Sequence, residues 1–170
     1  QRIPMNRDSL NSSLLLNGIV GCLKALSLIF SIIACQPQAP TGGDTYQVIR
    51  VIDGDTIVVE GGIRVRYIGM NAPEMDEPFG EEAREVNQTL VQGKRVKLEK
   101  DVSNMDRYNR WLRYVYVDGL MVNGEIVRSG LARAHRYPPD TKYQDYLDRL
   151  EQEARRAGRG IWARYKIPGK

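Results

Sequence analysis

The chain has 170 residues, of which 42% are apolar and 27% charged, and its formal net charge is +4. This composition fits one globular domain with a tail and excludes an intrinsically disordered chain. The charge is too small to indicate a nucleic-acid partner by itself. Cysteine occurs only at Cys22 and Cys35 and histidine only at His135. The chain beyond Cys35 therefore has no disulfide, and a mechanism that needs two histidines is excluded.

The first expected element is an apolar stretch near the N-terminus. Residues 13–34 are mostly apolar, but Asn17 and Lys24 interrupt them, whereas a membrane-spanning helix needs about 20 clean apolar residues. A secretory signal with Arg7 and Lys24 as its charged flank is the better interpretation. The apolar run ends at Cys35, and it resembles a bacterial lipoprotein signal, in which cleavage precedes a cysteine that is then acylated. An ordinary cleaved signal and an uncleaved anchor are the alternatives.

The remaining chain divides into a linker, a folded part and a tail. We expect residues 1–35 to direct export and Cys35 to be lipidated, which puts the protein at the bacterial cell membrane or outside the cell. Residues 36–44 are rich in Pro and Gly and predict a flexible linker. The folded domain is expected over residues 45–165, and residues 166–170 form a basic tail.

Five short strands are expected in the folded part, because β-branched and alternating residues lie between turn signals. Gly61 and Gly62 indicate a tight hairpin between the second and third strands. Pro73 follows the third strand and cannot continue its ladder. The strands are predicted over residues 46–52, 56–60, 63–70, 95–100 and 111–117.

Three helices are expected from apolar residues near helical spacing, over residues 81–92, 122–129 and 143–157. Gly130 and Gly158 follow the last two, where glycine often ends a helix. Five short strands and three helices predict an α+β fold that is mainly β barrel. The class that we expect is a five-stranded OB-fold barrel capped by three helices. That class often binds oligonucleotides, although a fold does not establish a function.

One stretch, residues 53–74, concentrates groups that suit phosphodiester chemistry. It carries three carboxylates and two arginines in two strand-like segments and a turn. Carboxylates can gather a divalent cation, and the planar fork of arginine can bind phosphate with paired hydrogen bonds. The five charged residues are Asp53, Asp55, Arg64, Arg66 and Glu74.

Three ordered motifs carry a family resemblance. They are DGDT at residues 53–56, RYIGMNAPE at 66–74 and DRYNR at 106–110. Together they resemble the staphylococcal nuclease family over residues 46–163. The resemblance implies a nuclease that hydrolyses phosphodiester bonds of DNA and RNA with Ca²⁺ as cofactor and leaves 3′-phosphate ends.

The resemblance assigns catalytic and substrate-binding roles by position. Arg66 and Arg110 match the two arginines that hold the phosphate. Glu74 matches the acid that positions or deprotonates the attacking water. Tyr108 matches a tyrosine near the nucleotide pocket.

The implied metal ligands are Asp55, Asn71 and the backbone carbonyl of Ala72. Asn71 stands where the family usually has a second carboxylate. It keeps an oxygen ligand but loses one charge, which is expected to weaken Ca²⁺ binding. Asp53 and Arg64 are interpreted as supporting residues.

The alternative function is a non-catalytic OB-fold module that binds nucleic acid, as in family domains that have lost catalytic residues. Asp55, Arg66, Glu74 and Arg110 are all present, which favours the enzyme. Each alone has a plainer interpretation, because Asp55 could only form a turn and Arg66 could only be a solvated strand residue. We expect a monomer, and His135 stays unassigned as a surface residue near the pocket edge.

Overall fold

The computed structural model describes residues 37, 39 and 45–165. The predicted export segment with Cys35, most of the predicted linker and the predicted basic tail lie outside these residues. Within the described part, every helix is too short or too polar to cross a membrane.

Five main strands form the barrel: β1 (Thr45–Val51), β2 (Thr56–Val59), β3 (Ile63–Tyr67), β5 (Arg95–Glu99) and β6 (Trp111–Val117). They pair in the order β3-β2-β1-β5-β6, and these neighbours are antiparallel. A parallel pairing of β3 with β6, from Val65 opposite Trp111 to Tyr67 opposite Arg113, closes the barrel. The predicted OB-fold barrel is therefore confirmed.

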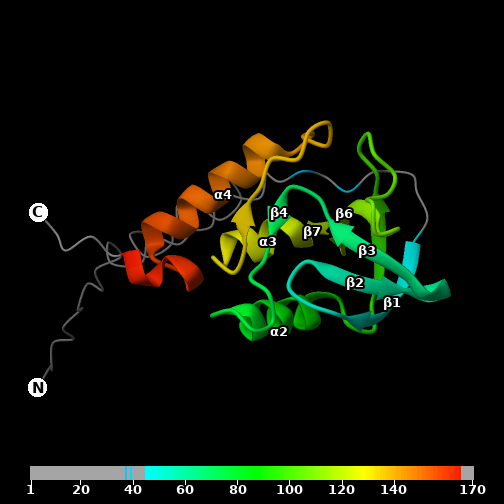
Figure 1. Ribbon diagram of the computed structural model, residues 1–170, viewed down its shortest axis with the longest axis horizontal. Coiled ribbons are helices and arrows are strands. Elements are labelled where there is room, and N and C mark those ends of the chain that lie inside the picture. The colour runs from blue at the N-terminus through cyan, green and yellow to red at the C-terminus, as the bar shows by residue number, and fades with distance from the viewer. Residues whose placement is uncertain (1–36, 38, 40–44, 166–170) are drawn as a thin grey trace, which may run out of the picture. The chain divides into compact units, whose positions relative to one another are not determined.

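Three helices pack on the barrel (Figure 1). They are α2 (Gly80–Val91), α3 (Val122–Arg128) and α4 (Gln144–Ala157). Helix α2 packs against β1, and α3 packs against β6 and α4. The shorter elements are η1 (Glu60–Gly62), β4 (Met70–Asn71), β7 (Leu120–Met121), β8 (Arg133–Ala134) and η2 (Gly160–Tyr165).

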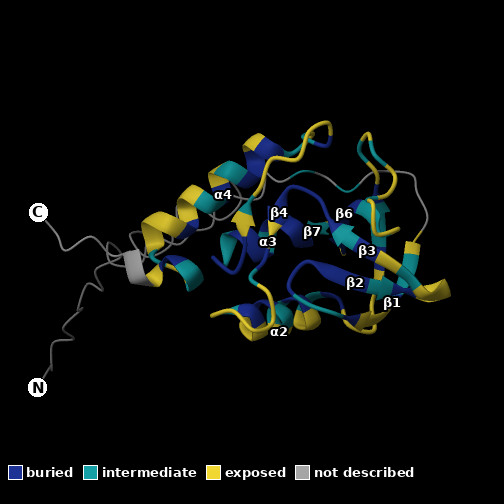
Figure 2. Ribbon diagram, in the orientation of Figure 1, coloured by how far each residue is buried: buried dark blue, intermediate teal, exposed yellow. Residues whose placement is uncertain are grey.

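The core lies inside the barrel and between the barrel and its helices. Figure 2 shows buried residues on the strands and on α3, whereas the outward faces of α2 and α4 are exposed. Leu147 and Leu150 extend the core from α4. The fully buried β-branched residues of the strands include Val48, Ile57, Val59, Val65, Val96 and Val115.

The third strand is shorter than the prediction of residues 63–70, which was wrong beyond Tyr67. The chain turns at Gly69, where φ is +78°, and a side chain there would lie 2.4 Å from Leu147 Cδ1. Met70 and Asn71 instead form β4, which pairs with β8. Strands of two residues such as β4 and β8 are too short to show an alternating pattern.

The predicted two-residue hairpin at residues 61–62 is instead the three-residue turn η1. Gly61 and Gly62 both adopt positive φ, +80° and +73°, so the glycines serve the turn as expected. The predicted strand and helix boundaries otherwise agree with the structure to within one or two residues.

A buried amide, Asn123 of α3, holds the end of β3. Its Oδ1 accepts the N–H of Val115 at 2.9 Å, and its Nδ2 donates to the carbonyl of Ile68 at 2.9 Å. A fully buried amide with these partners fixes the backbone between β3 and β4. That backbone carries the candidate site.

Candidate active site

Asp55 is the last residue of a tight turn and lies directly before β2. Asp53 Oδ1 accepts the N–H of Asp55 at 2.9 Å, and Asn87 of α2 donates to the carbonyl of Asp53 at 2.9 Å. A Cβ at Gly54 would lie 2.6 Å from Cβ of Ala72. Only glycine therefore lets the turn approach the segment after β4 so closely. Asp53 thus stabilises the turn that presents Asp55.

The Asp55 carboxylate joins three segments. Its Oδ2 accepts the backbone N–H of Ala72 at 2.8 Å and lies 3.0 Å from Nη2 of Arg66. Its Oδ1 accepts the hydroxyl of Thr56 at 3.1 Å. The residue is only 6% exposed. Strands β2 and β3 and the segment after β4 thus meet at one buried carboxylate.

The guanidinium of Arg66 organises the other side of the same point. Its Nη1 donates to the carbonyls of Tyr67 at 2.9 Å and Met70 at 3.1 Å, and its Nη2 donates to Asn71 Oδ1 at 2.8 Å. Oxygens of Asp55 and Asn71 therefore converge on one cationic group. Arg66 is partly buried, with 14% of its side chain exposed.

Arg110 reaches this region through the closure of the barrel. The parallel register pairs Val65 with Trp111, so Arg110 lies directly before the strand that adjoins β3. Its Nε donates to Asp106 Oδ2 at 2.7 Å, and its guanidinium carbon lies 5.4 Å from the ring centre of Tyr108. Arg66 on β3 and Arg110 directly before β6 are thereby carried by neighbouring parts of the barrel although they are distant in sequence.

Tyr108 lies in a short loop whose backbone is held by the side chains of Asp106 and Arg64. Asp106 Oδ1 accepts the N–H groups of Tyr108 and Arg110, and Arg64 donates to the carbonyl of Tyr108 at 3.0 Å. Partial burial raises the pKa of Asp106, but these hydrogen bonds outweigh it and lower the pKa below its usual value. Tyr108 is 54% exposed, and the guanidinium carbon of Arg107 lies 4.9 Å from its ring centre.

Glu74 follows β4 in an exposed loop. Its N–H donates to Glu77 Oε2 at 3.0 Å. A Cβ at Gly80 would lie 1.9 Å from the Glu74 carbonyl, so glycine is required there for this loop to close. The Glu74 carboxylate is thus presented to solvent three residues after Asn71.

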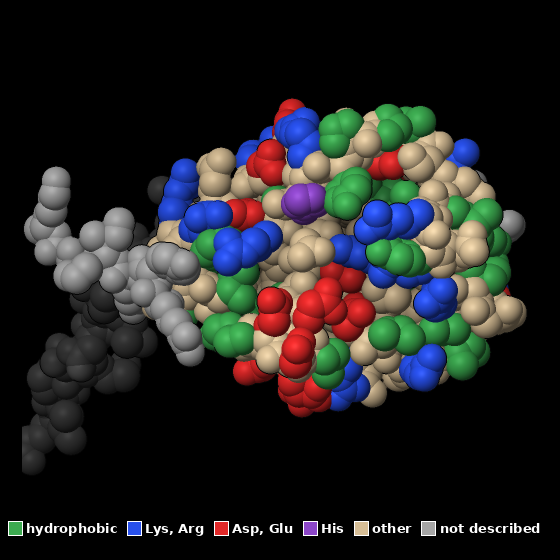
Figure 3. Space-filling model, viewed as in Figure 1, with side chains coloured by type: hydrophobic (Ala, Val, Ile, Leu, Met, Phe, Trp, Pro, Cys, Tyr) green, Lys and Arg blue, Asp and Glu red, His purple; other side chains and the backbone are tan. Residues whose placement is uncertain are grey.

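The surface around the site has an alternating charge (Figure 3). Acidic side chains gather in a band over the loop before α2, with Lys and Arg side chains on both sides. The exposed acids of this segment are Glu74, Asp76, Glu77, Glu81 and Glu82. The band attracts cations, and its basic flanks attract phosphate groups.

The family model described as staphylococcal nuclease homologue matches residues 64–164. The thermonuclease of Staphylococcus hyicus is 38% identical over 128 residues, which cover 70% of this chain and 76% of the relative. The thermonuclease of Staphylococcus intermedius is 37% identical over 131 residues, which cover 72% and 78%. Endonuclease YncB of Bacillus subtilis is 41% identical over 126 residues, which cover 68% and 60%. The chain belongs to the staphylococcal nuclease family.

This membership makes the chain a nuclease, an enzyme that hydrolyses phosphodiester bonds and whose substrate is nucleic acid. The alternative of a non-catalytic binding module is set aside. The individual site assignments remain predictions. The structure brings Asp55, Arg66, Asn71 and Ala72 into direct contact, and it puts Arg110 directly before β6, the strand that adjoins β3.

The donor groups of the site partly suit a hard cation such as Ca²⁺. Asp55 and Asn71 offer carboxylate and amide oxygens that both contact Arg66 Nη2 and so lie close together, and oxygen donors suit Ca²⁺. Within the described residues, no three Asp, Glu, His or Cys side chains gather to form a metal site. A cation at this place would therefore be held by neutral oxygens beside one carboxylate, and Asn71 as a ligand stays a prediction.

Sequence reasoning missed the residues that hold these groups in place. Asn87, Asn123 and Gly80 are ordinary residue types, and no pattern of spacing marks them. Their roles come from partners distant in sequence: Asn87 contacts residue 53, and Asn123 contacts residue 68. His135 is exposed, and its ring centre lies 5.0 Å from that of Tyr137 with the two ring planes tilted by 53°.

Burial raises the pKa of Asp55 to about 6, against the lowering effect of Arg66. The folded protein therefore holds this proton more tightly than the unfolded chain does. Stability is greater below the unfolded pKa and is lost as the pH rises through about 6. Without a bound cation, ionisation of the buried Asp55 carboxyl group therefore lowers the free energy of unfolding.

We predict that the metal-free protein loses up to about 3 kcal/mol of stability between pH 4 and pH 7 through Asp55 alone. Asp55→Asn removes the titrating group, so its unfolding free energy lacks this component. Urea unfolding in EGTA at several pH values measures the difference between wild type and variant. Other groups titrate in both proteins and cancel. A difference that is constant with pH would contradict the prediction.

Proposed function

We propose that this nuclease is Ca²⁺-dependent, cleaves both DNA and RNA, and leaves 3′-phosphate ends. One observation carries the proposal: the Arg66 guanidinium lies within 3.0 Å of both Asp55 and Asn71 oxygens. The oxygens that we propose to bind the cation thus lie next to the guanidinium that we propose to bind the phosphate. Arg110 lies directly before β6, the strand that adjoins β3. Charge of both signs beside one phosphate is what phosphodiester hydrolysis needs.

The proposed mechanism assigns each group one task. Arg66 and Arg110 bind the non-bridging phosphate oxygens and stabilise the negative charge that grows on them as water attacks. Glu74 accepts the proton of the attacking water. The bond from phosphorus to the 5′-oxygen breaks, the 5′-oxygen takes a proton from solvent, and the phosphate stays on the 3′-oxygen.

Asp55, Asn71 and the carbonyl of Ala72 would hold Ca²⁺. The ion supplies positive charge next to a phosphate oxygen. Without it, the N–H of Ala72 and the guanidinium of Arg66 satisfy the carboxylate of Asp55. These contacts keep the ligand oxygens oriented.

Action on both DNA and RNA follows from what the binding groups address. Arginines and a cation bind phosphate, which DNA and RNA share, and they do not read the edges of bases. Tyr108 offers an exposed ring for a base, and stacking tolerates every base. No group assigned here depends on a 2′-hydroxyl.

We predict that Glu74→Gln and Arg110→Gln each lower kcat by about 10²- to 10⁴-fold. Glu74 is exposed, so stability should hardly change. Glu85→Gln, an exposed acid on α2, is the matched control and should retain activity. The assay is cleavage of single-stranded DNA and of RNA in Ca²⁺ and in EGTA, with mass spectrometry of the product ends. Full Ca²⁺-dependent activity in both variants would contradict the assignment of Glu74 and Arg110 as catalytic residues.

A second prediction concerns the missing carboxylate. Asn71→Asp restores a charge at the ligand position, so the Ca²⁺ concentration for half-maximal activity should fall by about tenfold. Arg66 hydrogen-bonds the same oxygen and its contact becomes an ion pair. A calcium titration of cleavage measures the effect. An unchanged or higher calcium requirement would show that residue 71 is not a ligand.

We also propose that the chain is exported and that Cys35 carries a lipid. The support is the sequence alone, since residues 1–36 lie outside the described part. In the bacterial host, globomycin should leave an unprocessed precursor, and Cys35→Ser should release the nuclease from the membrane fraction. Normal processing without lipid at Cys35 would refute lipidation and leave the enzymatic proposal untouched.

A further inference from the structure

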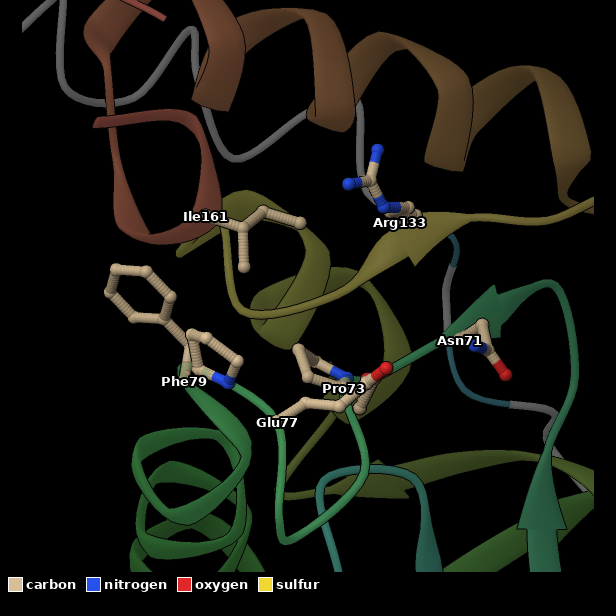
Figure 4. Close-up of a pocket in the computed structure, with 8 residues that line it drawn as sticks. Asn71, Pro73, Glu77, Phe79, Arg133 and Ile161 are labelled. Atoms are coloured by element: carbon tan, nitrogen blue, oxygen red, sulfur yellow. The ribbon is translucent and has the colours of Figure 1, made fainter. Parts of the chain in front are cut away.

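A cleft of about 440 Å³ opens beside the phosphate-binding groups. It begins at Asn71, at the candidate site, and extends past Pro73 to Phe79 and Ile161 (Figure 4). The volume falls in the range of small-ligand sites. The mechanism proposed above uses none of the residues beyond Ala72, so this part of the cleft has no assigned role.

The lining is apolar on one side and charged on the other. Phe79 and Ile161 are half-buried and supply apolar faces at the far end, with Pro73 between them and Asn71. Glu77 lies on the rim, where one carboxylate oxygen already accepts the N–H of Glu74. Flat apolar surface next to a polar rim suits a nucleic-acid base, which has an apolar face and polar edges.

Arg133 carries the positive charge of this cleft. Its backbone pairs with that of Asn71 across β4 and β8, so it belongs to the same short ladder as the candidate site. Among the described residues, no carboxylate forms an ion pair with it. Its guanidinium carbon instead lies 4.7 Å from the ring centre of Trp162. The charge therefore stays available for a phosphate oxygen.

Helix α4 and η2 hold Arg133 in this position. Trp162 is 2% exposed, and the guanidinium carbon of Arg155 lies 3.7 Å from its ring centre. Glu151 of α4 accepts the N–H of Ala134 at 2.6 Å, which anchors β8 to the helix. The arginine is thus supported by a buried ring and an anchored strand.

The cleft and Tyr108 approach the phosphate site from different elements. Tyr108 precedes β6, which adjoins β3, whereas the cleft lies along β4 and β8. A strand whose scissile phosphate lies at Arg66 has a nucleotide on each side of that phosphate. Tyr108 and the cleft thus offer separate places for these two neighbours.

We propose that the cleft binds the nucleotide next to the scissile phosphate on the side away from Tyr108. Its base packs against Phe79 and Ile161, and its outer phosphate contacts Arg133. The proposal rests on the phosphodiester site proposed above. It makes this enzyme sensitive to a base on both sides of the bond that it cleaves.

The test uses a single-stranded oligothymidylate of about six nucleotides with one abasic site, moved along the strand. Mass spectrometry of the products gives kcat/KM for each bond. In the wild type, an abasic neighbour on either side should lower cleavage of the adjoining bond by about 5- to 100-fold, since each stacked base contributes about 1–3 kcal/mol. This comparison requires no variant. If cleavage depended on a base on one side of the bond only, and Tyr108→Leu abolished that dependence, the proposal would be overturned.

Two matched variants separate the two sides. Phe79→Leu keeps an apolar side chain but removes the ring, and it should abolish base dependence on one side only. Tyr108→Leu should abolish it on the opposite side. If Phe79→Leu leaves both dependences intact, the cleft does not bind the base. Circular dichroism checks that both variants are folded.

Arg133 is tested through its charge. Arg133→Gln should lower kcat/KM about fivefold for strands that extend into the cleft and weaken its salt dependence. Arg50→Gln removes the same charge from an exposed position on β1 and is the control. Equal effects of the two variants would show a general electrostatic contribution and refute a specific contact.

Photocrosslinking distinguishes failure of the subsite from failure of the proposed function. An oligonucleotide with 5-iodouracil at each position in turn is irradiated with the wild-type protein in EGTA. A crosslink to residues 73–79 or to Ile161 supports the cleft even if Ca²⁺-dependent cleavage is absent. Efficient cleavage with crosslinks only to Tyr108 would reject the cleft and retain the function.

Discussion

The buried carboxylate of Asp55 is the constraint on which the site depends. It receives an N–H from Ala72, a hydroxyl from Thr56 and the guanidinium of Arg66. Burial of a carboxylate is costly unless such partners are present. Here they come from three segments of chain, so the same contacts that offset the burial also fix the relative positions of the catalytic groups. The side chain of Asp55 therefore contributes both to the stability of the fold and to the arrangement of the site.

Closure of the barrel positions the second arginine, which the carboxylate of Asp55 does not contact. The parallel pairing of β3 with β6 is only three residue pairs long, yet it brings Arg110 beside the strand that carries Arg66. From outside the barrel, Asn87 of α2 then holds the turn before β2, and Asn123 of α3 holds the end of β3. The helices thus do more than cover the core, because their amides fix the loops in which the chemistry is proposed.

Much of the fold could be predicted from the sequence, because its signals are local. Alternation and turn residues predicted the five strands, and helical spacing with Gly130 and Gly158 predicted two helix ends closely. The strand predicted to continue to Met70 was wrong, since Gly69 turns the chain to pair with β8. The ordered motifs predicted the family, which the comparisons confirm.

The sequence by itself determined which reactive groups are present and roughly which strands and turns carry them. Only the tertiary structure decided that Arg66 contacts both Asp55 and Asn71, and that β4 and β8 frame a cleft with Arg133. The physical reason is that spacing along a chain encodes contacts within an element. Contacts between elements depend on barrel register and on single close approaches, such as that of Gly54, which no local pattern records.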